Sequence, residues 1–310
     1  MLRGSNVFLS LDDAFKYCLT QLLGRGHRCS PRGMGTLELH AFNFSLLDPR
    51  RRYISIPERR WSIVYALGEF CWHARGATSV EEIASYAPKW KSFNKGVDAL
   101  GSSYGAKIFN SRPGRISQWE HVRAILANDS DTRRAVLYLS GDNSDAMDDG
   151  SDIACAISLQ FFLRDGCLDA VCVMRSNDVM LGMTYDVFLF TMLQEMMAVS
   201  LNVCVGHYHH FAGSLHMYDK DVALAKAILT SDSNVIEPMP EMISTSSLES
   251  FLKAERLASS VIADPEIELD RYWSALLSVI KAWHGLNDLE GEVFRVSDPI
   301  LRRLFNIRFN

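Results

Sequence analysis

The fold is decided by one stretch of the chain, Met174-Arg175-Ser176-Asn177-Asp178-Val179-Met180-Leu181-Gly182. An apolar run typical of a strand, residues 168–174, leads into it, and the long apolar run after Gly182 predicts a buried helix. An arginine and several polar groups therefore lie between two elements that belong to a protein core. Such groups are costly to bury unless they bind something, so we expect this turn to line a ligand site.

Apolar spacing predicts the elements around this turn. The runs 135–139, 156–163 and 168–174 are separated by turn-like segments at 141–144 and 164–166, which favours three adjacent strands. The remaining expected elements are helices at 9–23, 61–73, 220–229 and 272–281 and strands at 36–46 and 202–211.

The chain shows no internal repeat, low-complexity tract or linker that would divide it. Its polar, glycine-containing segment 76–115 is expected to form short helices and loops, which often carry ligand contacts. We therefore expect one domain, residues 1–310, of the α/β or α+β class with a mixed sheet.

Composition and charge narrow the function. The 310 residues are 48% hydrophobic, the net charge is −5 and the pI is about 6.0. No global positive field attracts a nucleic acid polymer, so an anionic ligand needs a local arginine cluster. Seven scattered cysteines without a C-x-x-C pair, and a start without the apolar core of a signal peptide, predict a reducing cytoplasm. Polar and charged residues interrupt the apolar stretch 179–205, which argues against a membrane span.

Three motifs together resemble the thymidylate synthase family. That family has a strand that begins with a catalytic cysteine, an Arg-Ser-x-Asp turn and a His-x-Tyr pair. The corresponding stretches here are Ala154-Cys155, Arg175–Asp178 and His216-Met217-Tyr218, and the resemblance covers roughly residues 25–230. Further matches are Glu69 on its apolar helix, Tyr104 before Gly105, the pair Arg133 and Arg134, and a phosphate loop at 31–36 whose arginine aligns as either Arg28 or Arg32.

The resemblance implies the fold, the reaction class and the site of that family. It implies a thymidylate synthase fold, with a mixed sheet and a long buried helix, that forms a homodimer through the sheet. It also implies a pyrimidine nucleoside monophosphate as substrate and 5,10-methylenetetrahydrofolate as co-substrate, with Arg133 and Arg134 reaching the phosphate in the neighbouring subunit. The implied roles are catalytic for Cys155, Glu69, Tyr104 and Asp186, substrate-binding for Arg32, Arg133, Arg134, Arg175, Ser176, Asn177, Asp178, His216 and Tyr218, and folate-binding for Trp90 and Gly182.

The chemistry of Cys155 and Glu69 agrees with these roles. A thiolate that adds to carbon 6 of a pyrimidine makes carbon 5 nucleophilic, and cysteine suits this task because its thiolate is a strong nucleophile. Glu69 lies on a mostly apolar helix, where burial raises the pKa of a carboxyl group and suits it to move protons. Taken alone, Cys155 would be interpreted as a buried structural cysteine, and Glu69 would be interpreted equally well as an exposed helix glutamate.

The other polar residues also have plainer interpretations. Arg175 and Ser176 would bind phosphate through the guanidinium fork and the hydroxyl, whereas an isolated arginine more often forms a surface salt bridge. By themselves, Arg133 and Arg134 would be interpreted as a solvated run of surface charge. A lone His-x-Tyr pair would be interpreted as structural. His207, His209 and His210 lie on a predicted strand without a cysteine or carboxylate cluster, so we expect no metal site.

One departure from the family pattern points to the base. Thymidylate synthases have an asparagine in the helix after the turn, and its amide pairs with uracil; here Asp186 takes its place. Cytosine presents an acceptor at ring nitrogen 3 and an amino donor, and a carboxyl group can donate to the first and accept from the second. Asp186 therefore points to a cytidylate, unless it only stabilises the start of the helix. Ala154 and Ala156, in place of proline and histidine, indicate a reshaped pocket.

The combined pattern resembles the (deoxy)cytidylate 5-hydroxymethylase branch of this family, found in phages and in nucleoside-antibiotic biosynthesis. We expect a homodimer that hydroxymethylates CMP or dCMP and leaves tetrahydrofolate unoxidised. Both nucleotides fit, because His216 and Tyr218 would contact the 3′ hydroxyl that the two share. The alternatives are a thymidylate synthase that methylates dUMP and a non-catalytic nucleotide-binding dimer.

Overall fold

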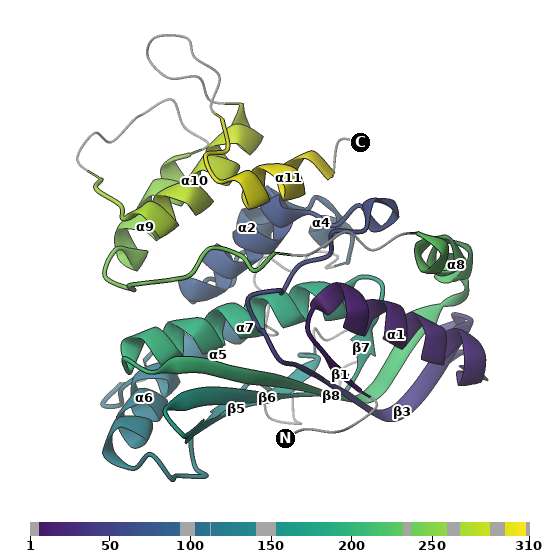
Figure 1. Ribbon diagram of the computed structural model, residues 1–310, viewed down its shortest axis with the longest axis horizontal. Helices are drawn as coiled ribbons and strands as arrows, with labels where there is room; N and C mark the ends of the chain where they lie inside the picture. The colour runs from purple at the N-terminus through teal and green to yellow at the C-terminus, as the bar shows by residue number, and fades with distance from the viewer. Residues whose placement is uncertain are drawn as a thin grey trace.

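The computed structural model describes residues 6–93, 103–111, 113–140, 153–231, 237–258, 267–285 and 295–307 (Figure 1). Within these ranges the strands form the expected mixed sheet, in the order β1-β3-β8-β6-β5-β4, with β2 beside β3 and β7 beside β8. The strands are β1 (Val7–Phe8), β2 (His27–Cys29), β3 (Thr36–Leu46), β4 (Val136–Tyr138), β5 (Ala156–Arg164), β6 (Cys167–Met174), β7 (Asn177–Asp178) and β8 (Cys204–Tyr218).

Two hairpins form one half of the sheet. Strands β4, β5 and β6 are successive antiparallel neighbours, which confirms the three adjacent strands that the apolar runs predicted. Asp165 and Gly166 connect β5 to β6 with φ angles of 50° and 75°, as a two-residue hairpin turn requires. Strand β8 then lies parallel to β6 and antiparallel to β3. The turn expected at 141–144 lies outside the described residues.

The helices expected at 9–23, 61–73, 220–229 and 272–281 are all present, and shorter helices fill the segment 76–115 where it is described. Helices α6, α9 and α11 are additional to those that the sequence predicted. The helices are α1 (Leu11–Arg25), α2 (Ile63–Ala74), α3 (Val80–Ala84), α4 (Lys89–Phe93), α5 (Tyr104–Phe109), α6 (Gln118–Asn128), α7 (Gly182–Ser200), α8 (Val222–Thr230), α9 (Leu248–Leu257), α10 (Arg271–His284) and α11 (Pro299–Ile307).

Helix α7 is the long buried helix expected after the polar turn. It packs on β6 and β8, and α1 and α7 cover the same face of the sheet, while α9, α10 and α11 gather around α2 above them (Figure 1). The polar residues that interrupt its apolar sequence have partners: Glu195 pairs with the buried Arg52, and Gln194 donates to carbonyl oxygens of β6 and β8. It is a core helix, and among the described helices none is long and apolar enough to span a membrane.

Strands β3 and β8 change direction at the same place. Ala41 of β3 has a φ angle of 51°, in the left-handed region, and the alternation of buried and exposed side chains shifts there. In β8 the alternation shifts at Gly213, where a Cβ atom would lie 3.0 Å from the carbonyl oxygen of Arg175. A side chain at this position would therefore press on the polar turn after β6.

This kink decides where the His-x-Tyr pair points. Tyr208 and His210 are buried beneath the helices, and strict alternation would put His216 and Tyr218 on that same face. The shift at the kink turns the latter two to the opposite side, where they are partly exposed. The strand expected at 202–211 thus continues past the kink to Tyr218.

Candidate active site

Cys155 lies one residue before β5 begins and is partly exposed. The pairing of β5 with β6 shifts between Ala156 and Ser158, which is a bulge next to the thiol. Arg175, just after β6, donates from its backbone N–H to the carbonyl oxygen of Cys155 (2.8 Å) and from Nε to that of Ala154 (2.9 Å). Its Nη2 lies 3.8 Å from Sγ of Cys155. The expected nucleophile and the expected phosphate arginine are therefore in contact.

Tyr104, the first residue of α5, lies beside Cys155. Its hydroxyl oxygen accepts a hydrogen bond from the N–H of Ala156 (3.2 Å), and its ring stacks on His73 with 5.2 Å between centroids. Burial raises the pKa of Tyr104 well above its usual value, and the charges of Asp186 and Cys155 raise it further. The tyrosine is therefore a neutral hydrogen-bonding group next to the thiol.

Asp186 projects from the second turn of α7 and is partly buried. Its Oδ2 accepts a hydrogen bond from Nδ2 of Asn177 (2.8 Å). Burial raises the pKa of Asp186 to about 7, against the lowering effect of Asn177, and the charge of Asp178 adds to the rise. Because α7 begins at Gly182 and has no acidic residue in its first turn, Asp186 is not a group that stabilises the helix start. With this pKa it can give or take a proton near neutral pH.

Glu69 lies in the middle of α2 and is partly buried, so it is not an exposed helix glutamate. Tyr65, one turn earlier, donates to Oε1 of Glu69 (2.7 Å), and Nε1 of Trp90 donates to the hydroxyl oxygen of Tyr65 (3.1 Å). Burial raises the pKa of Glu69 to about 8, although the Tyr65 hydrogen bond lowers it, and the charge of Asp186 contributes to the rise. Two carboxyl groups that interact with each other thus hold protons near neutral pH.

The His-x-Tyr pair lies at the same end of the sheet. The rings of His216 and Tyr218 are 5.4 Å apart, and Asp178 is the strand partner of His216. Burial raises the pKa of Tyr218, and its hydroxyl also interacts electrostatically with Asp178, Arg32 and Cys155. Arg175, Tyr104 and Tyr218, from three separate segments, therefore lie near the thiol.

The two candidates for the phosphate-loop arginine differ in their surroundings. Arg28 forms an ion pair with Asp219 (3.1 Å). Arg32 is exposed in the short 3-10 turn Pro31–Gly33, with a φ angle of 52°, and its charge acts on Tyr218. These surroundings favour Arg32 as the residue that faces the site.

Arg133 and Arg134 are not brought to Cys155 within one chain. Both are exposed before β4, and the backbone oxygen of Arg133 accepts a hydrogen bond from the side chain of Gln160 on β5. Gln160 is five residues along the strand from Cys155, which corresponds to about 17 Å. The two arginines can take part in a site of this kind only by reaching another subunit.

Tyr65, His210 and Tyr208 also support the site, although the sequence did not single them out for it. Tyr65 holds Glu69, and its i, i+4 spacing on the helix is a signal that could have identified it. Asn177, expected to bind substrate, is buried, with its Oδ1 2.9 Å from Nε2 of His210; Nδ1 of His210 is 2.9 Å from the hydroxyl of Tyr208. No spacing rule predicts this contact, because it joins strands that are distant in the sequence.

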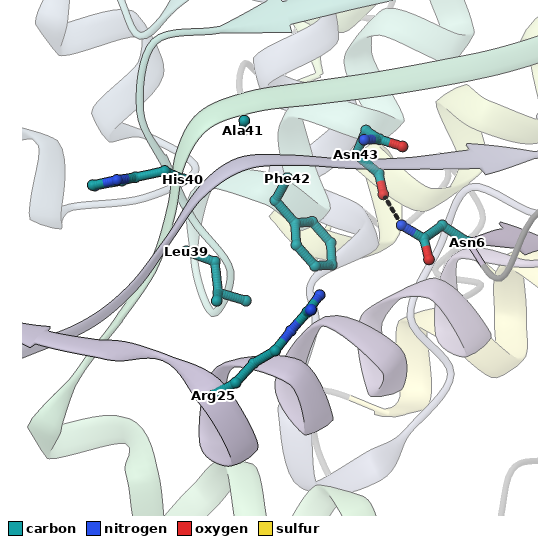
Figure 2. A pocket seen from close by; sticks show the side chains of 7 residues that line it. All are labelled: Asn6, Arg25, Leu39, His40, Ala41, Phe42 and Asn43. Carbon is teal, nitrogen blue, oxygen red and sulfur yellow. Dashed lines mark hydrogen bonds between the residues drawn. The ribbon is translucent and has the colours of Figure 1, made fainter.

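A pocket of about 280 Å³ lies at the kink of β3 and is lined by residues other than those of the candidate site (Figure 2). It is bounded by Asn6, Arg25 and residues 39–43, and Figure 2 shows the side chain of Arg25 pointing toward Phe42. It includes none of the expected site residues and has no carboxyl or thiol group. The described residues also contain no group of three side chains that could hold a metal ion. The candidate site therefore remains at Cys155.

Comparison with known proteins identifies the family. The family model described as thymidylate synthase matches residues 13–262. The thymidylate synthase of Buchnera aphidicola subsp. Schizaphis graminum is 26% identical over 215 residues, which cover 68% of this chain and 79% of that protein. The deoxyuridylate hydroxymethyltransferase of Bacillus phage SP01 is 28% identical over 214 residues, which cover 66% of this chain and 56% of the phage protein.

Proposed function

The chain belongs to the thymidylate synthase family, and from this premise we propose that it is a cytidylate 5-hydroxymethylase. Members of this family are one-carbon transferases that act on nucleotides with methylenetetrahydrofolate as co-substrate. The proposed reaction converts CMP or dCMP, with 5,10-methylenetetrahydrofolate and water, to the 5-hydroxymethyl nucleotide and tetrahydrofolate. The name of the phage relative supports the type of transfer, although that enzyme is named for deoxyuridylate.

The observation that carries the proposal is the carboxyl group of Asp186. It lies close enough to Glu69 and Tyr104 to act on the pKa of each, and its own pKa is raised to about 7 by burial. In its protonated form it can donate to ring nitrogen 3 of cytosine and accept from the amino group. An ionised carboxylate could only accept, so the raised pKa is the property that a cytosine-specific site requires.

The proposed steps use side chains that lie together. The thiolate of Cys155 forms a bond to carbon 6, Asp186 gives a proton to nitrogen 3, and carbon 5 becomes the nucleophile. The folate supplies a one-carbon unit at the oxidation level of formaldehyde. Glu69 and Tyr104 assist the removal of the proton from carbon 5. They also position the water molecule that adds, as hydroxide, to the transferred carbon. Asp186 then takes the proton back from nitrogen 3, the electrons released into the ring restore the double bond between carbons 5 and 6, and Cys155 leaves carbon 6 as a thiolate with the electron pair of the broken bond.

The residues expected to meet the folate suit a flat, partly apolar ring system. Trp90 is partly exposed and linked through Tyr65 to Glu69, and Leu181, beside the start of α7, is 49% exposed. A Cβ atom at Gly182 would lie 3.3 Å from Oδ2 of Asp186, so a larger residue would crowd that carboxyl group. We propose that this aromatic and apolar surface takes the co-substrate.

Phosphate binding and the homodimer are part of the same proposal. Arg175, Ser176 and Arg32 would bind the phosphate from their own chain, while His216, Tyr218 and Asp178 would contact the nucleoside. Arg133 and Arg134 would come from the neighbouring subunit. We also keep a cytoplasmic location in the proposal, since all seven cysteines are free thiols.

A panel of UMP, dUMP, CMP and dCMP with methylenetetrahydrofolate tests this function. We expect a cytidylate to gain a hydroxymethyl group by product mass, with tetrahydrofolate released. A methylated uridylate with release of dihydrofolate would identify a thymidylate synthase instead. Nucleotide binding without any product would indicate a non-catalytic dimer.

A further inference from the structure

Asp186 is held by a chain of hydrogen bonds that leads away from the candidate site into the core. Nδ2 of Asn177 donates to Oδ2 of Asp186 (2.8 Å), and Oδ1 of Asn177 lies 2.9 Å from Nε2 of His210. Nδ1 of His210 lies 2.9 Å from the hydroxyl of Tyr208. Asn177, His210 and Tyr208 are all buried, and the ring of His210 stacks on Phe44 at 5.0 Å.

The orientation of the Asn177 amide sets the direction of the hydrogen bonds along this chain. Burial lowers the pKa of His210 to about 3, so its ring is neutral, with one N–H donor and one acceptor. Since Oδ1 of Asn177 can only accept, Nε2 of His210 carries the hydrogen and donates to it, and Nδ1 then accepts from the hydroxyl of Tyr208. In this arrangement His210 supports the amide of Asn177 with its NH2 group toward Asp186. Rotating the amide would set two donors against each other at His210 unless the ring also changed its tautomer and Tyr208 turned its hydroxyl hydrogen away.

We propose that Asn177 and His210 are positioning residues that fix the order of donor and acceptor on Asp186 and so determine which pyrimidine base the site selects. Oδ2 is held as an acceptor by Asn177, so a protonated Asp186 carries its hydrogen on Oδ1. Cytosine and uracil present opposite orders of donor and acceptor at ring nitrogen 3 and the adjoining exocyclic group. A carboxyl group with a fixed order matches one of them, and the proposed function identifies that base as cytosine.

Among the described residues, five other titratable groups interact electrostatically with Asp186. They come from separate elements: Glu69 from α2, Tyr104 from α5, Cys172 from β6, Asp178 from β7 and Tyr208 from β8. None of them donates a hydrogen bond to Asp186 among the interactions of the described residues. Asn177 is therefore the group through which the core can set the position of the proton.

The test compares His210→Leu, which removes the donor, with His210→Gln, whose amide nitrogen can replace Nε2. For each protein, kcat/KM is measured for the cytidylate and the uridylate, and the Asp186 carboxyl is titrated by infrared difference spectroscopy without ligand. We expect His210→Leu to reduce the base preference about tenfold and to shift the pKa of Asp186 upward, because the bond from Asn177 that lowers it becomes weaker. His210→Gln should restore both toward the wild-type values. His40→Leu, at an exposed histidine of β3, is the control and should change neither.

Asn177→Ala gives a second route if His210→Leu does not fold, and the same two changes are expected. Wild-type preference and an unshifted carboxyl titration in either folded variant would overturn the inference. The inference rests on the proposed function only for the identity of the base. If the wild-type enzyme prefers a uridylate, the proposed function fails, whereas a preference that still collapses in His210→Leu supports the positioning role.

Discussion

At the level of single residues, the choice of base depends on Asp186, whose carboxyl group replaces an amide. Asp186→Asn exchanges a possible acid for a group that can donate to oxygen 4 and accept from nitrogen 3 with almost no change in volume. We expect the preference to move toward uridylates by about 10–100-fold in relative kcat/KM, since a mispaired buried hydrogen bond costs about 1–3 kcal/mol.

This comparison requires both bases in both proteins, because a general loss of rate says nothing about pairing. Glu69→Gln is the matched variant, since Glu69 also has a raised pKa but is expected to move protons for either base. It should slow both reactions alike. An unchanged cytosine-to-uracil ratio in Asp186→Asn would remove the main support for a cytidylate substrate.

Cys155 can be tested separately from nucleotide binding. Arg175 contacts the carbonyl oxygens of residues 153–155, which remain when the side chain is shortened. Cys155→Ala should therefore abolish turnover while the dissociation constant of the nucleotide changes little. Calorimetric titration and product mass measure the two quantities. A Cys155→Ala protein that turns over at a near-normal rate would contradict a covalent mechanism.

The raised pKa of Glu69 also predicts how stability depends on pH. The folded protein holds the proton up to about pH 8, whereas an unfolded chain releases it near pH 4.5, so stability falls as pH rises through this window. Glu69→Gln removes the ionisation. The variant should be more stable than wild type at pH 8 by about 1–3 kcal/mol, after allowance for partial exposure to solvent, and should differ little at pH 4.

Thermal unfolding at both pH values measures this difference, with Glu268→Gln, at an exposed glutamate, as the control. A gain that is the same at pH 4 and pH 8 would show that the effect does not come from ionisation. The prediction also implies that the active site costs stability near neutral pH.

Residue types alone revealed only part of the site. Cys155, Glu69 and Asp186 were identified through their places in the motifs that resemble the thymidylate synthase family, because Cys155 and Glu69 taken alone also have plain structural interpretations. The function of Asn177 does not stand out, because its partner His210 is 33 positions away and the contact depends on strand β8 lying beside β7. Sequence spacing predicts neighbours within one element, whereas this contact depends on tertiary packing.

At the level of elements, the approach of α5 to α2 positions Tyr104. A Cβ atom at Gly105 would lie 1.9 Å from the carbonyl oxygen of His73, so only glycine allows these helices to be this close. Gly105→Ala should destabilise the protein by about 1–3 kcal/mol and lower kcat, because Tyr104 moves away from Ala156. Gly24→Ala is the matched change, in a helix where nothing lies within 4 Å of the new atom, and should stabilise by about 0.4–1 kcal/mol.

Denaturant unfolding and kcat measure the two variants. If both glycine substitutions have the same small effect, the close packing of α5 on α2 does not control Tyr104. Gly105 thus links the packing of two helices to the position of Tyr104, a proposed catalytic group.

Helices and strands could be predicted where their cause is local in the sequence, and could not where it lies in a distant segment. Helix α1 and strand β3 were predicted because their apolar pattern repeats along the segment, and α7 was predicted because its apolar run is long. Helix α6 was missed although Ser117 and Glu120 form a capping box that marks its start. The kink of β8 could not be predicted, because it reverses the alternation on which strand assignment depends and is matched by Ala41 on another strand.

At the level of the whole molecule, the sheet has two unequal faces. Helices α1 and α7 cover one face (Figure 1), whereas Val171, Val173 and Phe211 on the other face are only partly buried. Partly exposed apolar side chains on neighbouring strands are typical of a surface that binds another protein. The proposed homodimer through the sheet would cover this face and would bring Arg133 and Arg134 of each chain toward the other chain's site.

Mixing two inactive variants tests this shared site. In a mixed dimer of Arg134→Ala and Cys155→Ala chains, one site has an intact Cys155 and receives Arg134 from its partner, while the other site lacks both. Random pairing of equal amounts makes half of the dimers mixed, so we expect recovery of about a quarter of wild-type activity. The control pairs Arg175→Ala with Cys155→Ala. Arg175 contacts Cys155 of its own chain, so no mixed site is complete and activity should stay absent. Failure of the first mixture to recover activity, with mixed dimers demonstrated by mass spectrometry, would contradict a site built from two subunits.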